Sequence, residues 1–92
     1  MRNNFNLTKS ERKFIFGQKL KQIIKLKKTK QEDVAVAVKM SPATISAMCK
    51  GNGNTEMDTY LDVIDFLKID SNMVFEITHE DIQKFLPVHQ PS

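Results

Sequence analysis

Hydrophobic residues recur along this chain at intervals of three and four, the spacing of helices that bury one face. The first such stretch predicts a helix over about residues 9–27, and Thr8 and Glu11 have the spacing of a capping box at its start. Outward lysines at positions 21, 25 and 28 share one face of this helix. The inward stripe is predicted to consist of Phe16, Leu20, Ile23 and Ile24.

A second, shorter helix is predicted from near Gln31 to near Lys39. Either Thr29 or Lys30 would be its N-cap, and Thr29 and Glu32 repeat the capping-box spacing. The positions expected to face inward in this helix, the turn and the helix that follows are Val34, Ala35, Val38, Met40, Ile45 and Met48.

A third helix is predicted to begin at Pro42, after a turn of three residues. Ser41 can accept a hydrogen bond from a free amide, and proline at the first helical position loses no bond that the helix would have used. Gly51 ends this helix, because glycine readily adopts the left-handed conformation of a helix C-terminus. With both apolar faces turned inward, the first residues of the third helix point outward, as in a helix-turn-helix module that reads DNA.

The second half of the chain predicts a fourth helix, ending near Lys68, and a further short helix. Thr78 and Asp81 have the spacing of a capping box, and this last helix would end before Pro87. Residues expected to pack from the fourth helix are Tyr60, Leu61, Ile64 and Leu67, with Met57, Val63 and Phe66 also available.

The fold class expected from these patterns is all-α: a compact bundle of about five to six short helices that contains a helix-turn-helix. Ninety-two residues, 40% of them hydrophobic, suit a single domain over 1–92. Within it we expect a helix-turn-helix module over 8–70, an apolar extension over 71–86 and a flexible tail over 87–92. The extension either completes the domain's own core or forms a two-fold dimer interface, and the sequence leaves both open.

Charge divides the chain into two unequal parts. Residues 1–30 contain ten basic side chains and one acidic, whereas residues 31–92 contain four lysines and ten acids. A dipolar chain of this kind can hold a polyanion on one side and repel it on the other. A lysine-rich helix that is merely solvated is the alternative interpretation.

Candidate chemistry of other kinds is sparse. Cys49 has no second cysteine with which to form a disulfide or a metal site, and single-cysteine usage fits a reducing cytoplasm. No run of apolar residues is long enough to span a bilayer. No clustered carboxylates, glycine-rich phosphate loop or metal-ligand set appears, so we expect no enzyme, metal, cofactor or small-molecule ligand.

Three segments in register carry a family resemblance. Residues 31–35 read Gln-Glu-Asp-Val-Ala, residues 41–46 read Ser-Pro-Ala-Thr-Ile-Ser, and Gly51 follows at the end of the third helix. Over residues 16–69 the chain resembles the lambda repressor and Cro-like helix-turn-helix family, the xenobiotic-response-element (XRE) type. Independently of the family, a small Ala35 suits a close helix crossing and Ile45 suits the angle between the two helices.

The chain departs from the family pattern at two places. The turn carries Lys39 where the family usually has glycine, so a left-handed backbone there would cost on the order of 1 kcal/mol. Ile24 and Cys49 replace an arginine and a glutamate that often form a partly buried ion pair in the family. An apolar contact can replace such a pair with little loss, so we predict that Ile24 and Cys49 touch in the core.

The resemblance implies a DNA-binding regulator, repressor-like and homodimeric, that inserts the third helix into the major groove of double-stranded DNA in the cytoplasm. The base-facing positions would be Pro42, Ala43, Thr44, Ser46 and Ala47. The backbone-facing positions would be Lys30, Gln31, Ser41, Lys50, Asn52 and Asn54. The base-facing set offers no bidentate side chain, so we expect modest discrimination and a large share from DNA shape and phosphate contacts. The alternative is a protein-interaction module, such as an antitoxin or adaptor, that binds DNA weakly.

Overall fold

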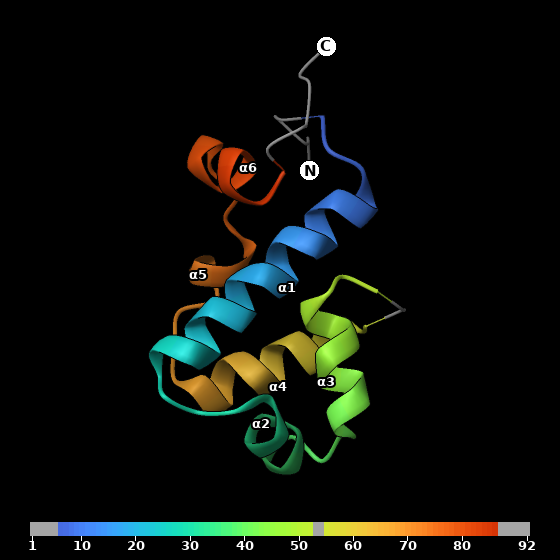
Figure 1. Ribbon diagram of the computed structural model, residues 1–92, viewed down its shortest axis with the longest axis vertical. Coiled ribbons are helices and arrows are strands. Elements are labelled where there is room, and N and C mark those ends of the chain that lie inside the picture. The colour runs from blue at the N-terminus through green and yellow to red at the C-terminus, as the bar shows by residue number, and fades with distance from the viewer. Residues whose placement is uncertain (1–5, 53–54, 87–92) are drawn as a thin grey trace.

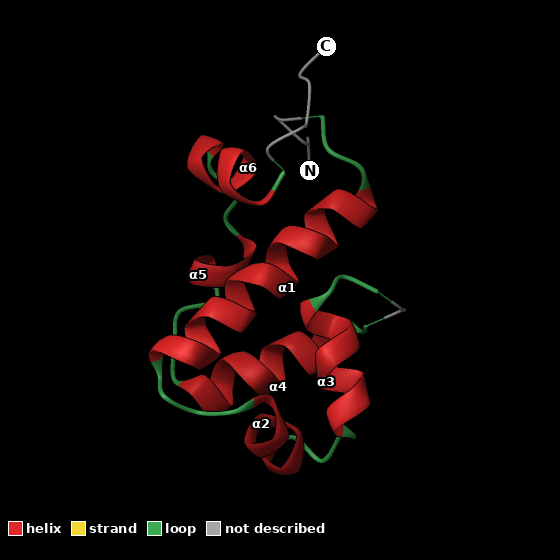
Figure 2. Cartoon of the chain, viewed as in Figure 1, coloured by secondary structure: helices red, strands yellow, loops and turns green. Residues whose placement is uncertain are grey.

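The computed structural model describes residues 6–52 and 55–86, and within these ranges it contains six helices and no strand (Figures 1 and 2). The all-α prediction of five to six short helices is therefore confirmed. Asn54 and the tail 87–92 lie outside the described residues. The helices are α1 (Lys9–Leu26), α2 (Gln31–Ala37), α3 (Pro42–Cys49), α4 (Met57–Leu67), α5 (Asn72–Phe75) and α6 (His79–Phe85).

Hydroxyl side chains fix the starts of α1 and α6, as their sequences predict. The Thr8 hydroxyl accepts a hydrogen bond from the Glu11 amide at 3.1 Å, and the Glu11 carboxylate accepts from the Thr8 amide at 2.8 Å. Thr78 and Asp81 repeat this reciprocal arrangement at the start of α6. Each box satisfies two amides that a helix start leaves without a partner.

The start of α2 is at Gln31, as predicted, and it decides between the two candidate caps. Lys30, the second of the two candidates, is the N-cap residue and makes no side-chain capping bond, so the Thr29–Glu32 spacing forms no capping box. The spacing was right, but the helix begins one residue too late for Thr29 to reach its amides.

A single apolar core joins α1 to α4 with one residue of α5. Its fully enclosed members come from every one of these helices and include Leu20, Val34, Ile45, Met48, Val63 and Val74. Phe16 and Val38 pack against the core while remaining partly exposed. The core thus holds α2, α3 and α4 in fixed positions along α1.

Two residues expected to face inward lie at the surface instead. Met40 is 39% exposed, because it follows the left-handed residue of the turn and no longer belongs to either helix. Leu61 is 41% exposed, since α4 buries the neighbouring stripe that contains Tyr60, Ile64 and Leu67. Met57 and Phe66, considered as further packing residues, are also exposed.

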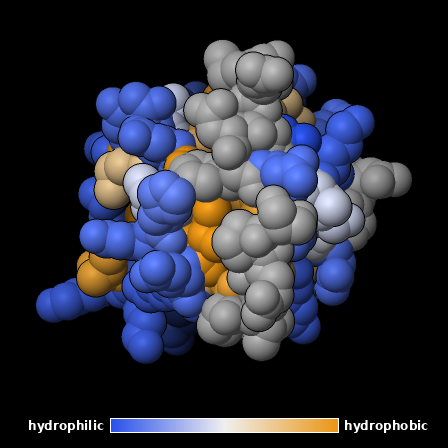
Figure 3. Space-filling model, turned by 90° about the horizontal axis from the view of Figure 1, so that it is seen from above, coloured by the Kyte–Doolittle hydropathy of each residue, from blue (hydrophilic) through white to orange (hydrophobic). Residues whose placement is uncertain are grey.

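The C-terminal helices attach to α1 in different ways. In α5, Val74 is buried in the core and the Phe75 ring lies edge-on to Phe16 and Tyr60, with centroids 5.2 and 5.9 Å away. In α6 no residue is buried, although Ile82, Phe85 and Leu86 at its end are partly covered. Apolar side chains reach the surface at this end of the molecule (Figure 3).

One ion pair links α6 to α1. Lys19 Nζ lies 2.6 Å from Asp81 Oδ2, and it also donates to the backbone carbonyl of Glu76. Burial raises the pKa of Asp81, but hydrogen bonds from Lys19 and the Thr78 backbone outweigh it and leave the pKa below its ordinary value. No helix in the described ranges is both long and apolar enough to cross a membrane.

Candidate nucleic-acid interface

The turn between α2 and α3 has the left-handed backbone that the family usually gives to glycine. Lys39 adopts φ +60°, and the Met40 amide donates to the Ala35 carbonyl at 2.9 Å, which closes the end of α2. A side chain in this conformation costs on the order of 1 kcal/mol. Lys39 therefore replaces the usual glycine without changing the backbone conformation of the turn.

The two helices are fixed to each other by buried apolar side chains. Ala35 in α2 and Ile45 in α3 have no exposed surface, and both belong to the core. These residues hold the angle between the helices, and neither is available to a ligand.

The opposite face of α3 is open to solvent. Pro42, Ala43 and Thr44 are exposed, while Ser46 and Ala47 are partly exposed. On the inner face, Ile45, Met48 and Cys49 are all buried. All five residues predicted to face bases therefore lie on the accessible side of a helix whose other side is anchored.

Two hydroxyls at the start of α3 form a pair. Ser41 Oγ accepts a hydrogen bond from the Thr44 amide at 3.1 Å and lies 2.8 Å from Thr44 Oγ1, where either oxygen can donate. One hydroxyl proton satisfies the pair, so the other is free for a phosphate or a base edge.

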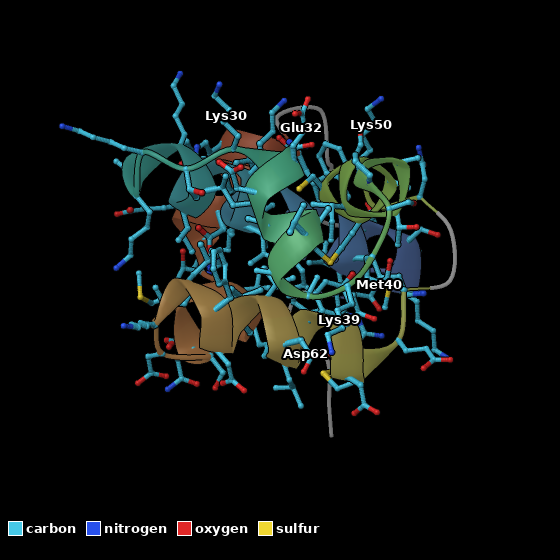
Figure 4. The ribbon with its side chains drawn as sticks, turned by 90° about the horizontal axis from the view of Figure 1, so that it is seen from below. Lys30, Glu32, Lys39, Met40, Lys50 and Asp62 are labelled. Atoms are coloured by element: carbon cyan, nitrogen blue, oxygen red, sulfur yellow. The ribbon has the colours of Figure 1, made fainter. Side chains whose placement is uncertain are left out.

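The residues predicted to contact the DNA backbone lie at the start of α2 and at the two ends of α3. Lys30, Ser41, Lys50 and Asn52 are exposed, and Gln31 is partly exposed. Seen from below, Lys30, Glu32 and Lys50 extend toward one edge of the molecule, whereas Lys39, Met40 and Asp62 lie toward α4 (Figure 4). Lys30 and Lys50 thus bring positive charge to both ends of the α2–α3 pair.

A close crossing that no sequence motif had predicted sets the position of α3 against α1. A Cβ added at Gly17 would lie 2.3 Å from the Met48 carbonyl oxygen and 2.6 Å from that of Cys49. The Gln18 side chain donates to the Cys49 carbonyl at 3.1 Å, which satisfies one orphan acceptor at the end of α3. The available signal was a glycine in the middle of a strong helical pattern.

Cys49 lies in the core and is not placed for chemistry. It is 1% exposed and belongs to the same buried cluster as Ile24, and a direct contact between these two side chains stays a prediction. Burial raises the pKa of the Cys49 thiol, and the positive charge of Lys21 opposes this in part. A protonated, enclosed thiol is a poor nucleophile.

Comparison with known proteins agrees with this geometry. A family model described as helix-turn-helix, HTH_3, matches residues 20–72, more than half of the 92-residue chain. The match begins within α1 and includes α2, α3 and α4 entire. No curated protein and no solved structure matches the chain. The chain therefore belongs to the helix-turn-helix family, of the XRE and Cro type, whose members are non-catalytic regulators that bind specific DNA sequences.

Proposed function

We propose that this protein is a repressor-like transcriptional regulator that places α3 in the major groove of its operator. The observation that carries the proposal is the exposure of Pro42, Ala43 and Thr44 on a helix whose Ile45, Met48 and Cys49 are buried. A helix of this kind can enter a groove without any change in the core.

The chemistry of the exposed face favours apolar contacts and single hydrogen bonds. The methyl groups of Ala43, Thr44 and Ala47 can pack on thymine methyls, and Thr44 and Ser46 can each make one hydrogen bond. Lys30, Gln31, Ser41, Lys50 and Asn52, with Asn54 outside the described residues, would contact phosphates. Because no bidentate reader is present, base discrimination would be modest and DNA shape would contribute much of it.

A matched pair of variants tests the role of α3. Ala43→Glu places a negative charge on the proposed base-facing side, whereas Ala37→Glu places the same charge on the exposed end of α2. Ala43→Glu should reduce DNA affinity at least about 10-fold, since repelling one phosphate contact or losing one base contact costs about 1–3 kcal/mol. Glutamate in the first turn of α3 also favours the helix dipole, so the loss would not reflect unfolding.

Selection of bound sequences from random duplexes provides the specificity test, and a salt titration on the selected duplex measures the phosphate contacts. Each neutralised phosphate should add about −0.9 to the slope of log K against log salt. A slope near zero, or equal affinities of the Ala43→Glu and Ala37→Glu proteins, would contradict the proposal.

Homodimerisation is part of the proposal and has a separate test. Two copies related by a two-fold axis would place their α3 helices one DNA turn apart and select a palindrome. The extension 71–86 is the proposed interface, and its exposed Met73 and partly covered Ile82 and Phe85 support this. Sedimentation at micromolar concentration should show twice the chain mass, and a monomer that selects a single half-site would oppose it.

The exposed apolar residues of α4 favour a second candidate, a protein-interaction module with weak DNA binding. Met57, Leu61 and Phe66 are 55%, 41% and 41% exposed and offer apolar surface to a partner. A stoichiometric protein partner, isolated from the source cell without retained DNA, would favour this candidate over the first.

A further inference from the structure

The α1 helix carries a row of exposed lysines that the recognition helix does not explain. Lys21, Lys25 and Lys28 are all exposed, and none forms an ion pair with another residue that the structure describes. Lys21 and Lys25 lie four residues apart and share one face of α1, and Lys28 follows two residues after the helix ends at Leu26. We call these three residues the lysine row.

The lysine row starts beside the end of α3. Gln18 lies three residues before Lys21 on the same face, and its side chain donates to the Cys49 carbonyl. Lys21 is close enough to Cys49 for its charge to act on the thiol. This end of the row therefore adjoins Lys50, the residue that caps α3.

The other end of the row leads to the start of α2. Lys28 has φ +56° and turns the chain out of α1, and Lys30 follows as the N-cap of α2. The short loop that leads from α1 to α2 is visible in Figure 1. Lys30 and Lys50 extend toward the same edge of the molecule in Figure 4. Both are predicted to contact the DNA backbone, so the lysine row lies between two residues of the candidate interface.

The distribution of charge between this side of the molecule and α4 favours the side of the lysine row for a polyanion. The segment from Lys21 to Asp33, taken together with Lys50, exposes six lysines and two acids, which are Glu32 and Asp33. The lysines are Lys21, Lys25, Lys27, Lys28, Lys30 and Lys50. By contrast, α4 exposes Asp58, Asp62 and Asp65, which repel phosphates.

The lysine row also has a length that suits a DNA strand. From Lys21 to its end at Leu26 the helix rises about 7.5 Å, which is about the axial rise of two nucleotides on one strand, and Lys28 lies beyond that end. Like charges at these intervals destabilise a helix unless an anion neutralises them. A nearby row of phosphates would supply that neutralisation.

We propose that Lys21, Lys25 and Lys28 form a second backbone-binding surface, which holds double-stranded DNA beside the segment that α3 contacts. The proposal rests on the proposed function and adds three phosphate contacts to it. These contacts are independent of sequence, so they strengthen binding to any duplex long enough to reach α1.

The test compares two triple variants of the full chain with equal change in charge. K21Q/K25Q/K28Q removes the row, and K39Q/K68Q/K84Q removes three exposed lysines from the α2–α3 turn, the C-cap of α4 and α6. Affinity for a mixed-sequence duplex of about 20 base pairs is measured over a range of salt concentrations. Thermal unfolding of both variants confirms that each remains folded.

Loss of three phosphate contacts should make the salt slope less negative by about 2.7, and the control should change it by less than about 1. At about 0.15 M salt the affinity of the row variant should fall on the order of 100-fold. Equal slopes for the two triple variants would overturn the lysine row while leaving the role of α3 intact. A wild-type slope near zero would instead remove the proposed function itself.

A control for another polyanion uses phosphatidylserine vesicles. Wild-type and row-variant proteins should differ much less on vesicles than on the duplex. Loss of vesicle binding in the row variant, with an unchanged slope on DNA, would assign the row to a membrane surface and overturn the proposal.

Discussion

Helices α3 and α6 are similar in length and begin in the same way, yet the rest of the chain holds them very differently. Both start at a residue whose hydroxyl accepts from the third amide of the helix. In α3 three residues are buried, and in α6 none is. The comparison shows that a capping residue determines where a helix begins, whereas burial determines how firmly it is held.

The attachments of the two helices to α1 differ in kind as well. At Gly17 the backbones of α1 and α3 approach so closely that no side chain fits, and Gln18 adds a hydrogen bond. At α6 the connection is the pair between Lys19 and Asp81, both partly solvated. Close packing requires a fixed geometry, and an ion pair near solvent contributes little to stability. We therefore expect α3 to open only with the whole domain and α6 to open alone.

The largest difference in the free energy of unfolding is expected when the same change, isoleucine to alanine, is made once in α3 and once in α6. Ile45→Ala in α3 should lower the free energy of unfolding by about 3 kcal/mol, because it leaves a cavity in the core. Ile82→Ala in α6 should cost about 1 kcal/mol or less, since that side chain is only partly covered. Urea unfolding of both variants measures the difference, and equal costs would remove the contrast.

The reactivity of Cys49 reports how tightly α3 is held. The thiol is enclosed in the buried cluster that also contains Ile24, and its pKa is raised, so reaction with a disulfide reagent requires an opening of several kcal/mol. The folded chain should react at least about 100-fold more slowly than the chain in urea. If both forms reacted at the same rate, the buried Ile24–Cys49 pair would be wrong.

A smaller effect is expected at the crossing of α1 and α3. Gly17→Ala should destabilise the domain by about 1–3 kcal/mol, because its methyl group would collide with two backbone carbonyls. Alanine favours a helix interior by about 1 kcal/mol over glycine, so a loss of stability would isolate the steric term. The control is Ser10→Ala at an exposed position of the same helix. A gain in stability for Gly17→Ala would show that the two helices can separate at no cost.

The smallest effect concerns α6 and its dependence on pH. Because the pKa of Asp81 is lower in the folded chain than its ordinary value of 3.8, the pair with Lys19 contributes its full stabilisation above about pH 3.8. That contribution is lost as the pH falls through the lower, folded value. Hydrogen-exchange protection of α6, corrected for intrinsic rates, should decrease in this window by less than about 1 kcal/mol. An Asp81→Asn chain should lack the pH-dependent step, and an identical step in both proteins would assign it elsewhere.

Local signals were sufficient to predict much of the fold. Thr8, Ser41 and Thr78 are at the expected helix starts, and Gly51 has φ +73° at the end of α3. These features depend on residues three or four positions apart, which a sequence displays directly. The same holds for the outward direction of α3, because the buried positions of a short helix fix its exposed ones.

Features that depend on distant residues were harder to predict. Either Thr29 or Lys30 could be the N-cap of α2, and only the path of the loop out of α1 decides between them. Met40 and Leu61 are as apolar as their neighbours, and only tertiary packing shows that the core is already filled without them. The single-turn helix α5 carries too few residues to display a period. For the lysines of α1 the sequence left two interpretations, a surface that holds a polyanion and a helix that is merely solvated, since their spacing does not show which helix they border.

The hydroxyl pair of Ser41 and Thr44 has a consequence for how strictly this protein would read its site. Either oxygen can donate within the pair. When Ser41 donates to Thr44, the Thr44 hydroxyl proton is free to donate to a base edge, and when Thr44 donates to Ser41, its oxygen can only accept. A thymine or guanine carbonyl and an adenine or cytosine amino group would then be accepted at the same step of the groove. The hydroxyls of Ser41 and Thr44 would thus let the protein bind more than one base at one position of the operator.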